Sequence, residues 1–435
     1  MDLAEDFLRR AREQLPQLGI RIVNPEDRCT TSAREVAQQT RACENGGATA
    51  IVYLIGTWIL ANHVLDAARD CRLPIAVWGV PDATAFSSVG ANVLHGTFEE
   101  IGLKHKLFNG YPEDGEFLSK LRCYLTACNA ADKLKKARLG LVGGRSISAY
   151  PTMADMNQVK ELFGVEIEHI DQMLLMEKAR KADEKKMAAV EAYLRRCSDV
   201  YVEQEMLQKA CSVAVALEEI CQEYGLDMVS VKCLGEFING YTSCCVALAW
   251  VNSLGIVAAC QCNVNAMLSM YIMRAMGAQD IYFGDVTVSM DGELHFINCG
   301  SLPFGLAGKE RPQLVEQYDY MGAGKGACTL FCCKAGEMTY GTLGRRKGEY
   351  YMNIATGTAY EKPIDQITDV RTWAQGFARL DGDPEVFYEN ILCNHTVGCY
   401  GNYQAELVEF CHLAGVIVQT NQWENSRRKR YYAGK

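Results

Sequence analysis

The polar residues with the clearest capacity for chemistry lie in the stretch between Cys260 and Ser301. Gln261 and Asn263 precede a segment whose apolar residues recur at helical spacing, and Gly277 ends that predicted helix. A short apolar strand at 281–283 then leads to Asp285. A carboxylate at the C-terminal end of a strand is where α/β folds place general bases and cation ligands. An isolated aspartate there also commonly opens a turn, so its neighbours decide between the two interpretations.

Two further residues could join Asp285. Glu236 follows the predicted strand at 229–233, where a carboxylate either starts a helix or serves a site. His395 is one of seven histidines and stands in the glycine-containing segment C-N-H-T-V-G-C-Y-G-N, close to Asn390 and Asn394. Because Gln261 follows the predicted strand at 255–260, parallel pairing would place it at the same sheet edge as Asp285.

Taken together, these motifs resemble the L-fucose/L-arabinose isomerase family. Gln261 stands where that family has an acidic residue before a helix, and Asp285 stands where it has a carboxylate after the next strand. The I-N-C-G-S segment at 297–301 resembles a family glycine turn, and Asn394-His395 resembles its metal-binding histidine segment. Three N-terminal patterns also resemble the family, at Arg21, at Trp58 and at Trp78. The resemblance extends over nearly the whole chain.

The resemblance implies an isomerase that interconverts aldoses and ketoses by moving a proton between C1 and C2 through an enediol. A divalent cation would hold adjacent sugar oxygens, and a carboxylate would carry the proton. Oxygen ligands with one imidazole suit Mn²⁺ or Mg²⁺. The predicted metal ligands are Asp285, His395 and Gln261, and the predicted catalytic residues are Asp285, Gln261 and Glu236. The predicted substrate-binding residues are Asn263, Asn390, Asn394, Trp58 and Arg21.

Gln261 departs from the family pattern. A glutamine offers only a neutral carbonyl oxygen, so it ligates weakly and cannot act as a base. Three interpretations follow: an isomerase on an unusual sugar, a different carbohydrate enzyme such as an epimerase or lyase, or a non-catalytic sugar-binding protein.

The order of expected elements predicts an α/β protein. Fully apolar strands alternate with helices, which indicates parallel sheets covered on both faces. We expect two Rossmann-like parallel-sheet domains at 1–137 and 138–285, the first beginning with a helix at 2–17 and a strand at 20–23. A β-rich C-terminal domain should follow at 286–435, with antiparallel strands within 338–354 and 367–377. The glycine-rich turn Gly143-Gly144-Arg145-Ser146 fits neither a dinucleotide nor a P-loop motif, so we interpret it as a strand-to-loop turn.

The net charge, the lengths of the apolar runs and the cysteine count exclude some classes of partner and location. The net charge of −9 argues against bulk nucleic-acid or anionic-membrane binding, and the basic tail at 427–430 is too short to change that. The first 20 residues have no apolar signal core and no run is long enough to span a membrane, so we expect a cytoplasmic protein. The 20 cysteines should therefore be thiols. The expected partner is a small-molecule sugar, and the resemblance implies a homo-oligomer, a trimer or hexamer.

Overall fold

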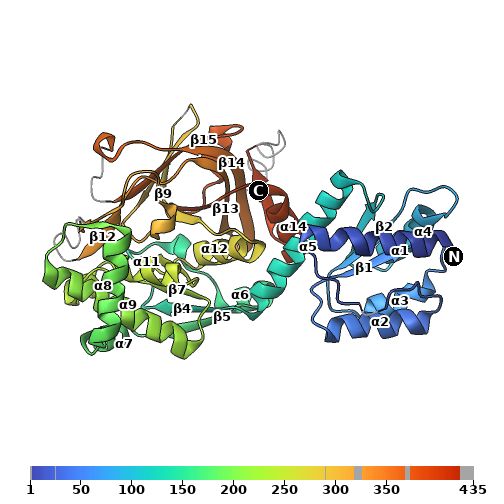
Figure 1. The fold of residues 1–435 in the computed structure, drawn as a ribbon, viewed down its shortest axis with the longest axis horizontal. Helices are drawn as coiled ribbons and strands as arrows, with labels where there is room; N and C mark the ends of the chain where they lie inside the picture. The colour runs from blue at the N-terminus through green and yellow to red at the C-terminus, as the bar shows by residue number, and fades with distance from the viewer. Residues whose placement is uncertain (1, 25, 290, 318–325, 368–372, 422–435) are drawn as a thin grey trace. The chain divides into compact units, whose positions relative to one another are not determined.

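A computed structural model describes the whole chain except residues 1, 25, 290, 318–325, 368–372 and 422–435. The chain folds into two compact units, Met1–Asp132 and Lys133–Lys435. The α/β class with a β-rich C-terminal part is confirmed, and Figure 1 shows the elements in chain order. The basic tail at 427–430 lies outside the described residues.

Unit 1 contains a parallel sheet of three strands, β1 (Ile51–Ile55), β2 (Ile75–Gly79) and β3 (Lys106–Asn109). Its helices are α1 (Asp2–Gln14), α2 (Ala33–Asn45), α3 (Asn62–Asp70), α4 (Ser87–Glu100) and α5 (Gly115–Lys136), the last of which leads into unit 2. Ser32 caps α2 by accepting from the Glu35 N–H, and the Glu35 carboxylate accepts in turn from the Thr31 N–H.

The strand predicted at 20–23 is wrong, because this segment has no strand partner and runs as irregular chain. The Arg12 side chain reaches from α1 to the segment that follows and donates to the backbone carbonyls of Asn24 and Glu26. This side chain thus satisfies two backbone carbonyls directly after the 20–23 segment, outside any sheet.

Unit 2 begins with a parallel sheet in the order β5-β4-β7-β8. Its strands are β4 (Arg138–Val142), β5 (Glu166–Ile170), β7 (Met228–Val231) and β8 (Val257–Cys260). The covering helices include α6 (Met156–Phe163), α9 (Gln204–Tyr224), α10 (Glu236–Gly240) and α11 (Cys245–Ser253). Two further helices, α7 (Gln172–Arg180) and α8 (Glu184–Cys197), follow β5, and Asp183 caps the second.

Six further strands form an antiparallel barrel, and a seventh strand, β17, pairs with it at β14. The order is β13-β16-β9-β10-β15-β14-β17, and pairing of β13 with β14 closes the ring. The strands are β9 (Ile281–Val288), β10 (Glu293–Asn298), β13 (Gly336–Arg346), β14 (Glu349–Tyr360), β15 (Ala374–Leu380), β16 (His395–Tyr400) and the parallel β17 (Ile417–Thr420). Buried aromatic and aliphatic residues fill its core, including Tyr282, Phe296 and Tyr340. Closure leaves few exposed sheet edges, which protects the barrel from edge pairing.

The remaining elements lie around these layers. A small sheet joins β6 (Asp199–Val200), β11 (Gln313–Glu316) and β12 (Ala327–Leu330), and two helices, α13 (Pro384–Asn390) and α14 (Gln404–Ala414), pack on the barrel strands. Within the described part of the chain, no helix has the length and hydropathy needed to cross a membrane. All 20 cysteines are free thiols, as expected.

Helix α12 (Val264–Met276) is the element that joins the parallel sheet to the barrel. It packs on β7 and β8 of the sheet and on β9, β13 and β16 of the barrel, and Figure 1 shows it between these two layers. Almost all of its residues are buried, which is unusual for a helix of a globular protein and follows from this two-sided packing. The start of α12 is therefore held at one place against both layers.

Candidate active site

Asp285 and His395 lie directly opposite each other on two barrel strands. In the antiparallel pair β9–β16, His395 is the register partner of Asp285, and their side chains approach to 3.9 Å between Nε2 and Oδ1. Alternation along β9 turns Tyr282 and Val286 into the barrel core, so Asp285 faces outward, on the side where α12 packs. The structure thus brings together two residues that are 110 positions apart in the sequence.

Asp285 does not stand at the end of a strand of the parallel sheet, as the sequence suggested. It lies inside β9, and β9 belongs to the barrel, whereas Gln261 follows β8 of the parallel sheet. The expectation that both residues share one sheet edge is wrong. The polar Asp285 interrupts an apolar run and so looked like a strand end, although cross-strand pairing continues to Val288.

One oxygen of the Asp285 carboxylate faces two neighbouring side chains, and one of them bonds it. Asn394 Nδ2 donates to Oδ1 at 2.5 Å, and His395 faces the same atom. Burial raises the pKa of Asp285 above its ordinary value, while His395 and the Asn394 hydrogen bond oppose that shift. The side chain is nevertheless 49% exposed, so it remains open to a ligand. A carboxylate with a raised pKa and an accessible oxygen is suited to general-base work.

The His395 imidazole is almost fully buried, and its neighbours hold the ring. Phe283 lies beside it with ring centroids 4.5 Å apart, and Asn263 Nδ2 lies 2.9 Å from Nδ1. Burial lowers the pKa of His395 below its ordinary value, against the opposing effect of Asp285. The imidazole is therefore neutral at pH 7.

The tautomer of His395 follows from the capping role of Asn263. The Asn263 Oδ1 accepts from the Ala266 N–H as the N-cap of α12, which leaves Nδ2, a donor, facing His395 Nδ1. Nδ1 must then accept, so this hydrogen-bond network assigns the ring proton to Nε2, toward Asp285. Asn263 was predicted to bind substrate, but its observed contacts orient His395.

Gln261 lies two residues before Asn263, in the turn between β8 and α12. Both Gln261 and Cys262 have positive φ, 69° and 49°, which side-chain-bearing residues adopt at a cost. The Gln261 N–H donates to Val231 O, which fixes the turn to β7. The Gln261 side-chain Oε1 is buried, and among the described residues it has no hydrogen-bond partner. A buried acceptor without a partner indicates room for a cation, a water or a substrate hydroxyl.

Glu236 stands apart from this cluster in its contacts. It begins the short helix α10, its side chain is 68% exposed, and it pairs with Lys232 at 2.9 Å. The hydrogen bond from Lys232 lowers the pKa of Glu236. A solvated, paired carboxylate with a lowered pKa is a poor proton carrier at neutral pH.

The other predicted substrate-binding residues have mixed placements. Asn390 ends α13, is buried, and has both amide atoms unpaired among the described residues. Arg21 and Trp58 belong to unit 1, where both are exposed. Trp78 is fully buried and donates to Gly110 O, so it is a core residue. The substrate-binding roles of Asn390, Arg21 and Trp58 stay predictions.

Cysteines near the cluster were not anticipated as site residues. Cys260 Sγ and Cys299 Sγ lie 3.5 Å apart, and Cys299 is close enough to both Asp285 and His395 to affect their pKa values. Cys393 Sγ accepts from Asn263 Nδ2. The abundance of cysteine in apolar runs concealed these positions, since most of the 20 are ordinary buried thiols.

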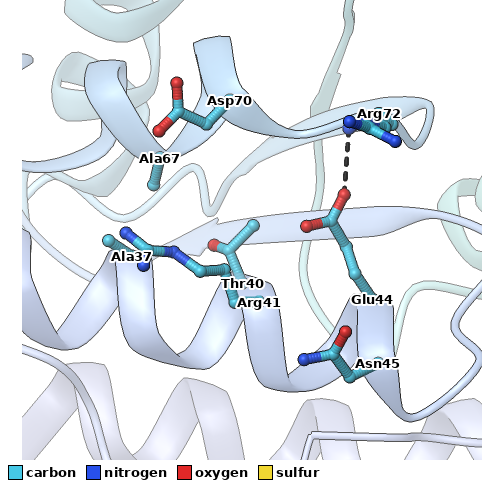
Figure 2. Close-up of a pocket in the computed structure, with 8 residues that line it drawn as sticks. All are labelled: Ala37, Thr40, Arg41, Glu44, Asn45, Ala67, Asp70 and Arg72. Atoms are coloured by element: carbon cyan, nitrogen blue, oxygen red, sulfur yellow. Dashed lines mark hydrogen bonds between the residues drawn. The ribbon is translucent and has the colours of Figure 1, made fainter.

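Two surface hollows lie elsewhere. One is in unit 1 between α2 and α3, where the Arg72 N–H donates to Glu44 at 2.9 Å, and its walls mix basic and acidic groups (Figure 2). The other lies in unit 2 at the starts of β7 and β8, the sheet edge opposite the turn that holds Gln261. Neither is lined by a predicted site residue.

Comparisons with known proteins agree with the resemblance noted above. Residues 296–421 match the family described as "L-fucose isomerase, C-terminal domain". This segment contains the end of β10, the strands β13–β17 and His395, and thus most of the barrel.

Curated relatives extend the similarity toward the N-terminus. The chain is 26% identical over 322 residues to a sulfoquinovose isomerase of Clostridium sp. (strain MSTE9), covering 70% of this chain and 67% of the relative. It is 22% identical over 326 residues to that of Alkalicoccus urumqiensis, covering 72% and 73%. It is 20% identical over 373 residues to that of Priestia aryabhattai, covering 83% of each.

Proposed function

We propose that this chain is a divergent member of the fucose isomerase-like family and that it interconverts an aldose and a ketose at Asp285. The observation that carries the proposal is the Asp285 carboxylate on β9, bonded by Asn394 and facing His395, with one oxygen left for a ligand. This arrangement supplies a positioned base with a raised pKa beside a neutral imidazole.

The donor types of two predicted ligands suit a divalent cation, because both are oxygen atoms. Asp285 offers an accessible carboxylate, and Gln261 offers a buried Oε1 without a partner among the described residues. His395 would ligate through Nε2 only after its proton moves away from that atom, because Asn263 occupies Nδ1. Asp285 and Gln261 would therefore hold the ion, and the oxygen-rich set favours Mg²⁺ or Mn²⁺. A bound cation would stabilise negative charge that develops on the sugar oxygens.

The proton transfer can be assigned to the protein's own groups. Asp285 removes the proton from C2 of the open-chain aldose, and the C–H electron pair forms the C1=C2 bond while negative charge moves to O1. A proton passes from the O2 hydroxyl to O1, and Asp285 returns its proton to C1, leaving a carbonyl at C2. The Asn394 hydrogen bond orients the carboxylate for this shuttle, and His395 Nε2–H faces the same oxygen at 3.9 Å.

A sulfonated hexose is the substrate we propose to test first, since the relatives named above are sulfoquinovose isomerases. Arg145 is a candidate anion-binding residue at the same edge of the parallel sheet as Gln261. It follows β4, and its guanidinium lies over the Tyr150 ring at 4.3 Å from the centroid. The same loop accepts a hydrogen bond from Asn265 of α12 at Pro151 O. A cation there would meet the sulfonate of a sugar bound at Asp285.

The test is a substrate panel in D₂O with Mn²⁺ or Mg²⁺, read by NMR. Sulfoquinovose, L-fucose, L-arabinose and glucose should be compared with wild type and Arg145→Met. We expect exchange at C1 or C2 of the sulfonated sugar, and a higher KM for that sugar alone in Arg145→Met. Exchange of a neutral sugar only would refute the sulfonate assignment. Sugar binding without exchange on any member would favour the non-catalytic interpretation that Gln261 left open.

A further inference from the structure

A second cluster of metal-ligating side chains lies in unit 1, outside the candidate active site. His95 and Glu99 are one helical turn apart near the end of α4, and His105 stands just before β3. The three ligand atoms lie within 4.8 Å of one another. Among the described residues, this is the one group of three or more potential ligands that meets that limit.

The spacing of the three ligand atoms fits one ion. His95 Nδ1 and His105 Nε2 are 2.7 Å apart, and each lies 3.9 Å from Glu99 Oε1. A tetrahedral zinc ion with bonds of about 2.0–2.2 Å needs ligand atoms roughly 3.3–3.6 Å apart. The observed separations bracket that range. To bind one ion, the exposed Glu99 carboxylate must approach the two nitrogens by about 0.3–0.6 Å, and the partly exposed His95 ring must move about 0.6–0.9 Å away from His105 Nε2.

His105 is the anchor of the cluster. Its side chain is 1% exposed, its ring packs edge-on against Phe98, and its Nδ1 lies 2.8 Å from Leu103 O. A carbonyl only accepts, so Nδ1 carries the proton and Nε2 presents its lone pair to His95. A backbone carbonyl bonded to the far nitrogen is how metal-binding histidines are oriented.

His95 becomes the second nitrogen ligand by a change of tautomer, so the number of protons on its ring stays the same. In the metal-free form its Nδ1–H donates to His105 Nε2. Transfer of that hydrogen to Nε2 of the same ring frees Nδ1, so both imidazoles then offer lone pairs while staying neutral. The two nitrogens and one carboxylate oxygen leave one position open toward solvent on the Glu99 side, since that side chain is 66% exposed.

We propose that His95, Glu99 and His105 form a binding site for zinc or a similar transition-metal ion, with three protein ligands and one exchangeable position. Two imidazoles favour Zn²⁺, Co²⁺ or Ni²⁺ over Mg²⁺ and Mn²⁺. This site is independent of the proposed function, and its chemistry differs from the oxygen-rich set of Asp285 and Gln261. The ion would fix the end of α4 to the chain segment that enters β3.

The experiment is a titration of chelator-stripped full-length protein with Co²⁺, followed by visible absorption and then by displacement with Zn²⁺. The Asp285→Asn variant provides a background in which the candidate active site has lost its carboxylate. We expect one equivalent of Co²⁺ to produce the strong visible bands of four-coordinate cobalt in this background, and one equivalent of Zn²⁺ to remove them.

Glu99→Gln and His95→Ala should each weaken that binding by more than about tenfold, since even loss of a residue that only hydrogen-bonds to a metal ligand costs about 10–100-fold in affinity. Glu100→Gln is the matched control, because it removes the same charge one residue away on α4 and should bind Co²⁺ as the background does. Glu99 is exposed, so Glu99→Gln retains a folded unit even if His95→Ala does not. Absence of the bands, or equal binding in Glu99→Gln and Glu100→Gln, would overturn the proposal.

Discussion

At the scale of single residues, Asp285 carries the only carboxylate among the predicted metal ligands. Gln261 is neutral where the resembling family has an acid, and its buried Oε1 lacks a partner among the described residues. A divalent cation held here would therefore face one unit of negative charge from these ligands instead of two. Because only one negative charge faces the cation, we expect substitutions at this site to change metal affinity more than any other property.

Gln261→Glu should tighten the divalent ion, because it adds an anionic ligand at an atom that already lacks a partner. We expect at least about a tenfold lower dissociation constant for Mn²⁺, which corresponds to about 1.4 kcal/mol. Equilibrium dialysis against Mn²⁺ measures this directly. Gln279→Glu adds the same charge after α12 and should leave the constant unchanged. Unchanged affinity in Gln261→Glu would remove Gln261 from the ligand set.

Asn394→Ala should shift the acid limb of the pH–rate profile to higher pH. The Asn394 hydrogen bond lowers the pKa of Asp285, so its removal raises that pKa further, and the base is then protonated at a higher pH. The profile of kcat/KM from about pH 4 to 8 gives the limb, and Asn402→Ala, which removes an amide bonded to Glu337, is the control. A limb that stays in place or moves to lower pH would contradict the assignment of Asp285 as the base.

At the scale of elements, the start of α12 contributes both to the stability of the fold and to the candidate active site. Asn263 caps this helix through Oδ1 and contacts His395 through Nδ2, so one amide serves both. The β8–α12 turn that precedes it contains two consecutive non-glycine residues with positive φ. Strain of this kind persists only where the surroundings determine the backbone, here through Val231 and the packing of α12 on two layers.

Asn263→Ala and Asn263→Ser separate the two roles of this residue. The alanine variant should lose about 1 kcal/mol of stability with the cap, whereas serine retains a capping oxygen. Both variants lose the contact to His395 and should lower kcat. Asp155→Ala removes the cap of α6 and serves as the control that loses stability alone. Thermal unfolding and steady-state kinetics provide the two readouts. Full kcat in Asn263→Ser would mean that Asn263 is only a cap.

Some strands could be predicted from the sequence, whereas the pairing of others could not. The parallel strands β7 and β8 were predicted because short continuous apolar runs are typical of strands buried on both faces. Strand β9 was cut short at Asp285, since a carboxylate in the middle of a strand breaks the hydrophobic pattern. Its pairing with β16 crosses more than 100 residues, and no local periodicity encodes it. The family resemblance alone joined Asp285 to His395 before the structure placed them together.

At the scale of the whole molecule, the described residues form two units. Their sheets are of three kinds: parallel sheets, the antiparallel barrel and a small mixed sheet. The division into domains at 137 and 285 stays a prediction. Unit 2 is described from residue 133, and position 285 falls inside β9. The candidate active-site residues Gln261, Asp285 and His395 all belong to unit 2, whereas Arg21 and Trp58 belong to unit 1.

We propose that unit 1 takes part in assembly into a trimer or hexamer. Trp58 is 52% exposed, and exposed apolar residues occur in the same unit at Leu60, Phe86 and Val89. Residues 57–59 pack against α4 at Gly90, where an added Cβ would lie 2.5 Å from Thr57 O, so Trp58 and Val89 belong to adjoining segments. Such a surface is typical of a subunit contact.

Trp58→Glu should therefore reduce the mass measured by light scattering at micromolar concentration. Ile417→Glu, an exposed apolar position in unit 2, is the matched control and should leave the mass unchanged. A wild-type monomer under these conditions would refute the assembly.

The most direct test of the central claim is deuterium exchange into the isomerised sugar, compared in wild type, Asp285→Asn and Glu236→Gln. Asp285→Asn keeps the shape of the side chain but removes the base, so we expect exchange at C1 or C2 to fall at least about a thousandfold, within the roughly 10²–10⁴ range of general-base catalysis. Glu236 is solvated and paired with Lys232, so Glu236→Gln should exchange at the wild-type rate. Full exchange in Asp285→Asn, with loss in Glu236→Gln, would contradict the account.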